Sequence, residues 1–462
     1  MTDQETKPIE LSLYKAHEKI YPREIKGRFQ YKRKLAVLVL LGLFYILPWI
    51  SWEGQQAILF DLPHRRFHIF GLTLWPQDFI FLALMLIIAA FSLFFFTALA
   101  GRLWCGFACP QTVWTEVFIW MEQLTEGNRN KRMKLDKAPW STEKVLRKTS
   151  KQFLWITFAL WTGFTFVGFF TPIKELAAHV WSWQLGPWET FWLFFYSLAT
   201  YGNAGFLREQ VCLYMCPYAR FQSAMFDKET LIISYDGQRG EPRMRGKKRR
   251  EAEAPGDCID CTLCVQVCPT GIDIRDGLQY ECIGCAACID ACDEVMEKSG
   301  MPKGLIKYTT ENALNGKPTH IIRPRTLVYF TILMLLVSSF GIALLSRSSI
   351  DMNVIHDRNS FYRVVNAQTI ENVYTLKVMN KGKTTTGYKL SATGLEGLEV
   401  LLGMNETEIV AEPGQLVEVP IKIRAAKAVA NKKIHTIEVT VTALDETGDA
   451  ASETVKYFGY NK

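Results

Sequence analysis

The stretch CIDCTLCVQVCP at residues 258–269 and its near copy CIGCAACIDACD at residues 282–293 place eight cysteines at matching intervals. In each run, three cysteines are separated by two residues and a fourth follows after three more. Three thiolates at that spacing can reach three irons of one cubane, while the turn carries the fourth to a second cubane. The pattern therefore predicts a bacterial-type two-cluster ferredoxin domain of the α+β class over residues 257–300.

The crossed spacing also assigns the ligands of two [4Fe–4S] clusters. The first is predicted to take Cys258, Cys261, Cys264 and Cys292, and the second to take Cys282, Cys285, Cys288 and Cys268. Zinc is the main alternative, but a zinc site needs one or two CxxC pairs rather than two four-cysteine runs. Asp293 stands where a proline usually follows the second run, which alters the turn and leaves the number of ligands unchanged.

The other four of the twelve cysteines form two pairs with the spacing C-x₃-C-P. These pairs are Cys105 and Cys109, and Cys212 and Cys216. Residues four apart are neighbours on one helical face, so each pair is predicted to present two thiolates together. Four thiolates suit a soft ion such as Cu(I). A third iron–sulfur cluster, a redox-active thiol relay and ordinary buried cysteines are the alternatives.

Five apolar segments are long enough to cross a bilayer, which takes about 20 residues. They lie at residues 35–52, 78–100, 153–170, 190–206 and 327–345. Lys and Arg alternate between the connecting segments, with nine in 1–34, two in 53–77, ten in 101–152, one in 171–189 and seventeen in 207–326. The positive-inside rule then predicts a cytoplasmic N-terminus, cytoplasmic cysteine-bearing loops and a periplasmic C-terminus.

The order of these segments predicts the domain organisation. Two spans followed by C-x₃-C-P occur twice in the same orientation, which indicates a parallel repeat. Residues 1–34 have no apolar core or cleavage site, so we expect a cytoplasmic segment rather than a signal peptide. The regions that follow are the first repeat at 35–110, a cytoplasmic loop at 111–152, the second repeat at 153–217, a basic linker at 218–256, the ferredoxin domain at 257–300, a linker at 301–326, the fifth span at 327–345 and an outer domain at 351–462.

The outer domain differs in composition from the rest of the chain, because it has no cysteine and no tryptophan. Apolar and polar residues alternate at 374–379, 417–423 and 437–442, and turn residues separate these stretches. This pattern predicts an Ig-like β-sandwich. The predicted fold is therefore a membrane α-helical protein with five transmembrane helices, a cytoplasmic two-cluster ferredoxin domain and a C-terminal all-β Ig-like sandwich.

Three further sequence patterns bear on binding sites. The basic run at 247–250 is compatible with nucleic acid, but such runs next to membrane spans usually set topology, so no nucleic-acid partner is expected. His64 and His68, in the loop after the first span, could bind a metal, although a spaced pair in a loop is more often solvated. No G-x-G-x-x-G follows a predicted strand, so the sequence predicts no nucleotide or flavin site.

Longer strings carry a resemblance to a known family. They are FHIFG at 67–71, GRLWCGFACPQ at 101–111, QVCLYMCPYARFQ at 210–222, RGEP at 239–242 and PTGIDIR at 269–275. With these strings the chain resembles, over nearly its whole length, the cbb3-type cytochrome c oxidase accessory proteins, the CcoG/FixG/RdxA family. The resemblance implies a multi-pass protein of the bacterial inner membrane that reduces Cu(II) to Cu(I) for the binuclear centre of that oxidase.

The same resemblance implies partners and site residues. Oxidase assembly factors and copper chaperones or transporters are the implied partners, together with an electron donor that the sequence does not identify. Cys105, Cys109, Cys212 and Cys216 match the membrane-proximal pairs of the family and are the implied catalytic and copper-binding residues. Two other functions stay open: a quinol-linked electron-transfer subunit and a copper-binding assembly scaffold without enzymatic activity.

Overall fold

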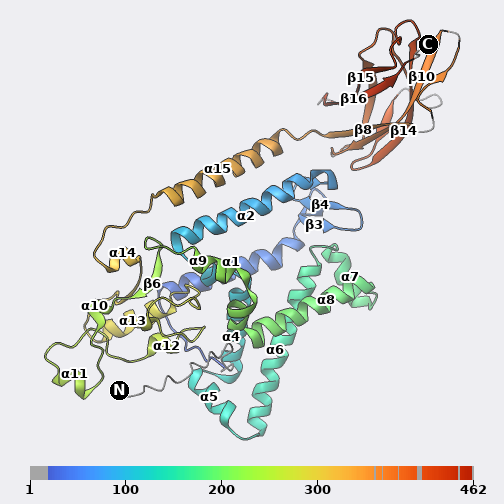
Figure 1. Ribbon diagram of the computed structural model, residues 1–462. Helices are drawn as coiled ribbons and strands as arrows, with labels where there is room; N and C mark the ends of the chain where they lie inside the picture. The colour runs from blue at the N-terminus through green and yellow to red at the C-terminus, as the bar shows by residue number, and fades with distance from the viewer. Residues whose placement is uncertain are drawn as a thin grey trace, which may run out of the picture. The chain divides into compact units, whose positions relative to one another are not determined.

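The computed structural model describes residues 19–357, 360–366, 368–382, 384–402, 408–445 and 448–459. The chain divides into two compact units, Met1–Val337 and Ser338–Lys462, and each is described by itself. Figure 1 shows the helices and strands of both units along the chain.

Five helical regions overlap the predicted spans. They are α1 (Arg28–Ile46), α2 (Phe79–Ala100), α6 (Thr142–Val167), α8 (Pro187–Thr200) with its π-helical continuation η3 (Tyr201–Leu207), and α15 (Pro324–Leu345). By length and composition, two stretches are long and apolar enough to cross a membrane: Pro76–Ala100, which includes α2, and α15. α1 and α6 begin in charged sequence, and α8 has 14 residues. Among the described residues, these three helices are therefore not counted as long and apolar enough to cross a membrane.

The segment after the first C-x₃-C-P motif is helical and packed. α4 (Pro110–Glu126) has an apolar face on which Val113 and Val117 contact Val37 of α1, while Phe118 contacts Trp155 of α6. This spacing along one face is what an amphipathic helix needs. α5 (Arg129–Lys137) follows, with the Asn128 side chain accepting the backbone N–H of Lys131 as its N-cap.

The two long helices of the second repeat, α6 and α8, approach each other closely. α6 carries Gly163, where a Cβ would lie 2.2 Å from Ser197 Oγ of α8. Only glycine leaves room for that contact, so the position brings the two helix backbones together. Figure 1 shows α6 and α8 side by side, with α4 next to α6.

The cysteine-rich domain is closed by a two-stranded antiparallel sheet. Its strands are β6 (Ile232–Tyr235) and β7 (Ile306–Thr309), which lie on either side of the predicted domain at 257–300. Between them come α10 (Gly237–Gly240), α11 (Lys247–Glu251), α12 (Leu263–Gln266) and α13 (Ala287–Lys298). Ile233 and Ile306 of the strands pack with Ile289 of α13 in one apolar core. Segments on both sides of the cysteine runs therefore belong to the same α+β fold.

The second unit is a β-sandwich, as the sequence predicts. One sheet has the order β12-β14-β10-β8, with β9 also paired to β10, and the other has the order β13-β11-β15-β16. The strands are β8 (Ile350–His356), β9 (Arg363–Val364), β10 (Thr369–Asn380), β11 (Thr386–Thr393), β12 (Glu399–Leu402), β13 (Ile409–Ala411), β14 (Leu416–Ala426), β15 (Ile434–Ala443) and β16 (Ala450–Phe458). Alternate residues of β10, namely Tyr374, Leu376 and Val378, are fully buried in the shared core.

Candidate functional site

The cysteines predicted for the first cluster line one cavity. Cys258 and Cys261 come from the loop that leads into α12, Cys264 lies in α12 itself, and Cys292 comes from α13. Burial raises the pKa of Cys292 to about 12, and the neighbouring thiols of Cys264, Cys258 and Cys261 add to the rise. The structure therefore brings these four thiols together, and we call them the first thiol set.

The cysteines predicted for the second cluster also meet. Burial raises the pKa of Cys282 to about 12, and the thiols of Cys285 and Cys268 contribute. Burial likewise raises the pKa of Cys288 well above its usual range, and the thiols of Cys285, Cys282 and Cys268 add to the rise. We call these four the second thiol set. Cys264 also acts on Cys288, so the two sets are adjacent.

The two cysteine runs have the same backbone shape. In the first run Asp260 and Thr262 have φ angles of 50° and 58°, and in the second run Gly284 and Ala286 have φ angles of 68° and 62°. In each run these are the second and fourth positions after the first cysteine. A positive φ is strained for a β-branched residue such as Thr262, so the surrounding fold must hold it. Turns of this kind point backbone N–H groups toward one side and form a concavity that suits an anionic group.

The residues present fit two [4Fe–4S] clusters. Backbone N–H groups of Gly284 and Ala287 face the thiols of Cys282 and Cys285, and such hydrogen bonds to cluster ligands tune the bound cluster. All eight thiols are free, and in the described chain no three His, Cys, Asp or Glu side chains gather closely enough to hold one ion. In a cubane each thiolate binds a different iron, so the eight thiols, four in each set, match the number of ligands that two clusters need. A bound cluster would accept and release single electrons.

Each C-x₃-C-P pair straddles a break between two helices. Cys105 lies in α3 (Leu103–Phe107) and Cys212 in the π-helix η4 (Val211–Met215). Cys109 and Cys216 are the extended N-caps, with ψ of 129° and 111°, of α4 and of α9 (Pro217–Ala224). The expectation that each pair shares one helical face is therefore wrong. The reason is the following proline, which disfavours helical geometry at the residue before it.

The two pairs nevertheless converge, as the repeat predicts. Burial raises the pKa of Cys212 to about 12, and the thiols of Cys109, Cys105 and Cys216 contribute to the rise. The Cys105 thiol lies 3.1 Å from Oε1 of the buried Gln222, to which it donates. Four thiols from two distant segments thus form one group, which we call the motif thiols. The absence of a tight single-ion site among the described residues applies to this group too.

Burial and the N-terminal end of α4 have opposite effects on the pKa of the Cys109 thiol. Burial raises the pKa of its thiol, while the backbone N–H groups of Thr112 and Gln111 counteract the rise. These N–H groups belong to the first turn of α4, where the helix has no internal partners for them. The N-cap position therefore favours the thiolate form that a metal or a cluster needs.

The repeat is also visible in the backbone before each motif. Gly101 and Arg208 are each four residues before the first motif cysteine, with φ, ψ of 56°, −123° and 39°, −110°. Glycine adopts this conformation freely, but it is strained for arginine. The Arg208 side chain is anchored on both sides, because Nε donates to Gly205 O at 2.9 Å and Nη2 donates to Glu122 Oε2 at 2.9 Å.

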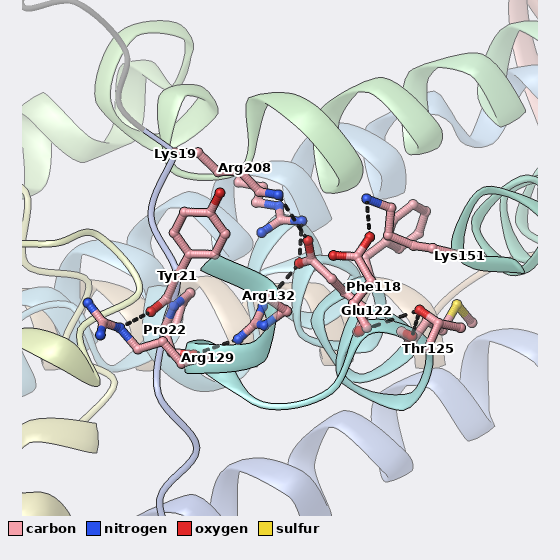
Figure 2. A network of polar contacts seen from close by, with 12 residues as sticks. Lys19, Tyr21, Pro22, Phe118, Glu122, Thr125, Arg129, Arg132, Lys151 and Arg208 are labelled. Atoms are coloured by element: carbon pink, nitrogen blue, oxygen red, sulfur yellow. Dashed lines mark hydrogen bonds and ion pairs between the residues drawn. The ribbon is translucent and has the colours of Figure 1, made fainter. Parts of the chain in front are cut away.

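Figure 2 shows the charged network that holds Arg208. Glu122 of α4 is fully buried and pairs with Arg208, with Arg132 Nη1 at 3.2 Å and with Lys19 Nζ at 3.3 Å. Burial alone would raise the pKa of Glu122, but the charges of Arg208, Lys19 and Arg132 outweigh it and lower the pKa to about 2. The carboxylate thus stays ionised inside the protein.

The same network ties down the segment Lys19–Ile25, which we call the strap. Arg132 Nη2 donates to Pro22 O at 2.8 Å, and Arg129 Nε donates to Tyr21 O at 2.9 Å. Further along, the Arg23 N–H donates to Gln266 O at 2.8 Å. Ile25 packs on the apolar cluster that contains Cys285. The strap therefore joins the α4–α5 region to the cysteine-rich domain.

The first C-x₃-C-P motif touches the second cysteine run. A Cβ on Gly106 would lie 2.8 Å from Gly284 O and 2.9 Å from Cys285 Cα. The buried Arg102 reaches across the same contact, since Nη1 donates to Tyr280 O and to Cys282 O, and Nη2 donates to Ala219 O. The motif thiols and the second thiol set thus stand on backbones that are in contact.

The two histidines in the segment between α1 and α2, His64 and His68, do not act as a pair. His64 Nδ1 lies 2.8 Å from Asp61 Oδ2, and His68 Nδ1 lies 3.0 Å from Thr73 Oγ1. Burial lowers the pKa of His68, and the charge of Arg66 adds to the effect. Each ring therefore has its own partner, and within the described residues the histidines join no three-residue metal group.

Sequence reasoning missed three residues of this region. Arg102 and Gln222 lie inside the strings that carry the family resemblance, so their position was a usable signal. Glu122 had a weaker signal, a carboxylate on the otherwise apolar α4. The contacts of Glu122 with Arg208, of Gln222 with Cys105 and of Arg102 with Cys282 join segments that are far apart in the chain, which no local pattern reveals.

These features define an iron–sulfur electron-transfer protein with a dicluster ferredoxin domain and an Ig-like domain. Residues 207–311 match a family model described as a 4Fe-4S dicluster domain, and residues 81–132 match a 4Fe-4S binding domain. Residues 340–459 match a model described as an Ig-like fold at the C-terminus of FixG.

Full-length relatives give the family. The nitrogen fixation protein FixG of Rhizobium meliloti is 40% identical over 407 residues, covering 80% of this chain and 78% of that protein. Protein RdxB of Cereibacter sphaeroides is 41% identical over 417 residues, 87% of each chain, and its protein RdxA is 39% identical over 400 residues, 84% of each. The chain therefore belongs to the FixG/RdxA family. A crystal structure of a FixG-related protein from Vibrio parahaemolyticus is 28% identical over 24% of this chain and 98% of that one, with a TM-score of 0.22.

Proposed function

We propose that this protein is a membrane cupric reductase that supplies Cu(I) during assembly of a cbb3-type cytochrome c oxidase. The contact at Gly106 carries the proposal, because it sets the motif thiols against the backbone of the second thiol set. Electrons held by the two-cluster domain then have a short route to thiolates that prefer Cu(I). Membership of the FixG/RdxA family supports the redox role.

The cysteines divide into three roles under this proposal. Cys258, Cys261, Cys264 and Cys292 hold one [4Fe–4S] cluster, and Cys282, Cys285, Cys288 and Cys268 hold the other. Cys105, Cys109, Cys212 and Cys216 meet the copper ion. Each Cu(II) takes up one electron and leaves as Cu(I), and no proton or chemical group is transferred. The soft thiolates favour the product ion over Cu(II), while burial keeps water away from it.

The proposal includes a topology in the bacterial inner membrane. Five spans place the N-terminus and the ferredoxin domain in the cytoplasm and the Ig-like domain in the periplasm. The exposed apolar surfaces of α2 and α15 and the alternation of Lys and Arg between spans support it. Copper chaperones or transporters and oxidase assembly factors are the proposed partners.

Anaerobic reduction followed by addition of Cu(II) tests the function directly. The purified chain, reduced and freed of excess reductant, should form Cu(I), which a chromogenic Cu(I) chelator traps. Replacing all four motif cysteines by serine should abolish the rapid phase, while Leu103→Ala, in the same helix as Cys105, should preserve it. Equal rates in the serine variant would reject the thiolate role. Reduction of the iron–sulfur sites by added quinol, or oxidase maturation by Cys258→Ser, would favour the quinol-linked or scaffold function respectively.

One observation favours a second role for the motif thiols. The match of residues 81–132 to a 4Fe-4S binding domain includes Cys105 and Cys109, and these thiols are grouped without a single-ion site in the described chain. Under this alternative, all four thiols hold a third cluster. Iron analysis separates the two cases, since two cubanes give about eight irons per chain and three give about twelve.

A further inference from the structure

The segment before the first cysteine run is a closed loop rather than an open linker. Backbone N–H groups of Gly256, Asp257 and Cys258 donate to Pro242 O, Arg239 O and Gly240 O at 3.1, 3.0 and 3.4 Å. These bonds pair the two ends of the segment with each other, and residues 243–255 form the loop between them. Both ends of the loop therefore lie close to Cys258, the first ligand of the first thiol set.

Contacts from inside the loop fix it further onto Cys258. The Met244 N–H donates to Cys258 O at 3.4 Å, and Arg249 Nη1 donates to the same oxygen at 3.4 Å and also to Gly256 O. A second guanidinium, that of Arg239, pairs with Asp257 and donates to the carbonyls of Pro302 and Lys303. The loop is therefore held in a defined place beside the first thiol set. Figure 1 shows α11, which belongs to this loop, at the edge of the cysteine-rich domain.

The outer face of the loop is strongly basic. Residues 243–250 contain six Lys or Arg side chains, and all but Arg249 are exposed. Arg243 and Lys247 have acidic neighbours at 3.5–3.8 Å. For Arg245, Lys248 and Arg250 the described residues supply no ion-pair partner. These three charges face solvent directly beside the loop end that carries Cys258.

The position of this loop indicates which of the two thiol sets receives electrons first. The second thiol set contacts the first C-x₃-C-P motif through Gly284 and Cys285, so it is the natural exit toward the motif thiols. The first thiol set, which has the basic loop beside Cys258, is then the site at which electrons enter. A donor protein that meets a basic surface must carry acidic charge, and such complementarity raises the association rate.

We propose that the basic loop at residues 243–250 docks an acidic, one-electron carrier protein and that electrons enter the chain at the first thiol set. The inference rests on the proposed electron-transfer function and names the class of its donor. The reduced carrier gives up one electron and is oxidised, the iron–sulfur site held by the first thiol set is reduced by the same electron, and no proton or group moves. Recognition is by charge, so no specific pocket is required.

Stopped-flow reduction of the full chain tests the docking step without copper. The chain, in nanodiscs of zwitterionic lipid, is mixed with reduced flavodoxin, and bleaching of the iron–sulfur absorbance is followed. The combined variant Arg245→Glu, Lys248→Glu, Arg250→Glu should lower the second-order rate about tenfold or more at low salt. The wild-type rate should also fall steeply as salt is added, since screening weakens charge steering.

Two controls separate docking from general effects. Lys131→Glu, Lys134→Glu, Lys137→Glu makes the same charge change on exposed residues of α5 and should leave the rate unchanged. Photoreduced deazariboflavin, a small uncharged donor, should reduce all three proteins equally. Equal rates for the loop variant and the wild type with flavodoxin would overturn the proposal, as would equal losses in both variants. If the loop variant is reduced more slowly than the wild type only in nanodiscs of anionic lipid, the basic loop contacts lipid headgroups and the proposal is overturned.

The copper assay distinguishes a failure of the docking surface from a failure of the proposed cupric reductase. A loop variant that is reduced slowly by flavodoxin, but forms Cu(I) normally once reduced by deazariboflavin, supports the docking role alone. A wild type that accepts electrons from flavodoxin and forms no Cu(I) would overturn the cupric reductase and leave the docking surface intact.

Discussion

At the scale of single residues, Arg102 connects the second thiol set with the motif thiols. Arg102 donates to Cys282 O on one side and to Ala219 O of α9 on the other. Its charge also faces the thiols of Cys105, Cys282 and Cys212. One buried guanidinium therefore both joins the modules and adds a positive charge between their redox groups.

Arg102→Gln should lower the reduction potential of the second thiol set's iron–sulfur site. Reduction adds negative charge, which a nearby buried cation stabilises and a neutral amide does not. Arg102→Lys keeps the positive charge but loses the planar guanidinium with its several donors. This variant should therefore keep most of the reduction potential, while its contact with the second cysteine run weakens. A redox titration followed by EPR measures this. A potential that is the same in wild type and Arg102→Gln would contradict the electrostatic role.

Gly106→Ala should impair electron flow to the motif thiols, although alanine is the better helix former. The added Cβ would meet Gly284 O at 2.8 Å, and a backbone cannot yield as a flexible side chain can. We expect Cu(I) formation to slow about tenfold or more, because tunnelling through a widened contact falls off steeply, while iron content is retained. Gly202→Ala, at a site with nothing within 4 Å, is the matched control and should behave as wild type.

At the scale of secondary-structure elements, α4 is the organising helix of the first unit. Its N-terminus presents Cys109, its middle packs on α1 and α6, and its C-terminal half carries Glu122. Through Glu122 it supports Arg208, whose strained backbone leads into the second motif. One helix therefore contributes to both C-x₃-C-P motifs.

The Glu122 network predicts a pH dependence of stability. The pKa of Glu122 is about 2 in the folded protein, below its ordinary value of 4.5. The ionised carboxylate therefore contributes its full stability above pH 4.5, and this contribution is lost as the pH falls through about 2. Glu122→Gln should remove that dependence and lower the unfolding temperature at pH 7, because it leaves buried arginines unpaired. Thermal unfolding from pH 7 to pH 3 checks both.

A control for that experiment lies in the surface pair of Glu143 and Arg147, whose atoms are 2.9 Å apart. Exposed pairs of this kind contribute little to stability. Glu143→Gln should therefore leave the unfolding temperature and its pH dependence close to wild type. A similar loss in both variants would contradict the special role of Glu122.

Local patterns predicted some elements well and others poorly. The cysteine spacing indicated the two thiol sets, and the alternation of residues in 374–379 indicated the sandwich, because both signals are carried by adjacent residues. The break inside each C-x₃-C-P pair also has a local cause, because Pro110 and Pro217 disfavour helical geometry at the cysteine before them, whereas the four-residue spacing of the cysteines favours a continuous helix. The contacts of Arg102, Gly106 and Glu122 join distant segments, and no local pattern in the sequence indicates which segments meet.

At the scale of the whole molecule, the two units have separate cores. The Ig-like unit has its own apolar cluster around Leu376 and Ile421, both fully buried. A domain with its own core is expected to fold alone. Expressed from residue 349 onward, it should unfold cooperatively, with no dependence on iron or on the membrane.

Core substitutions in the isolated Ig-like domain should follow burial. Leu376→Ala removes a fully buried side chain and should lower the free energy of unfolding by about 2–5 kcal/mol. Lys422→Ala, on the neighbouring strand β14 and exposed, should change it by no more than about 0.5 kcal/mol. Chemical denaturation measures both. Similar losses would contradict the core assigned to this domain.

The strap has a consequence for the order in which the protein is made. Arg23 bonds to Gln266, and ribosomes add about 5–20 residues per second, so the partner of Arg23 is synthesised roughly ten to fifty seconds later. Until then Ile25 has no cysteine-rich domain to cover. The strap therefore leaves the ribosome long before its partner, and its contact with the apolar cluster that contains Cys285 can form only after the second cysteine run has been synthesised.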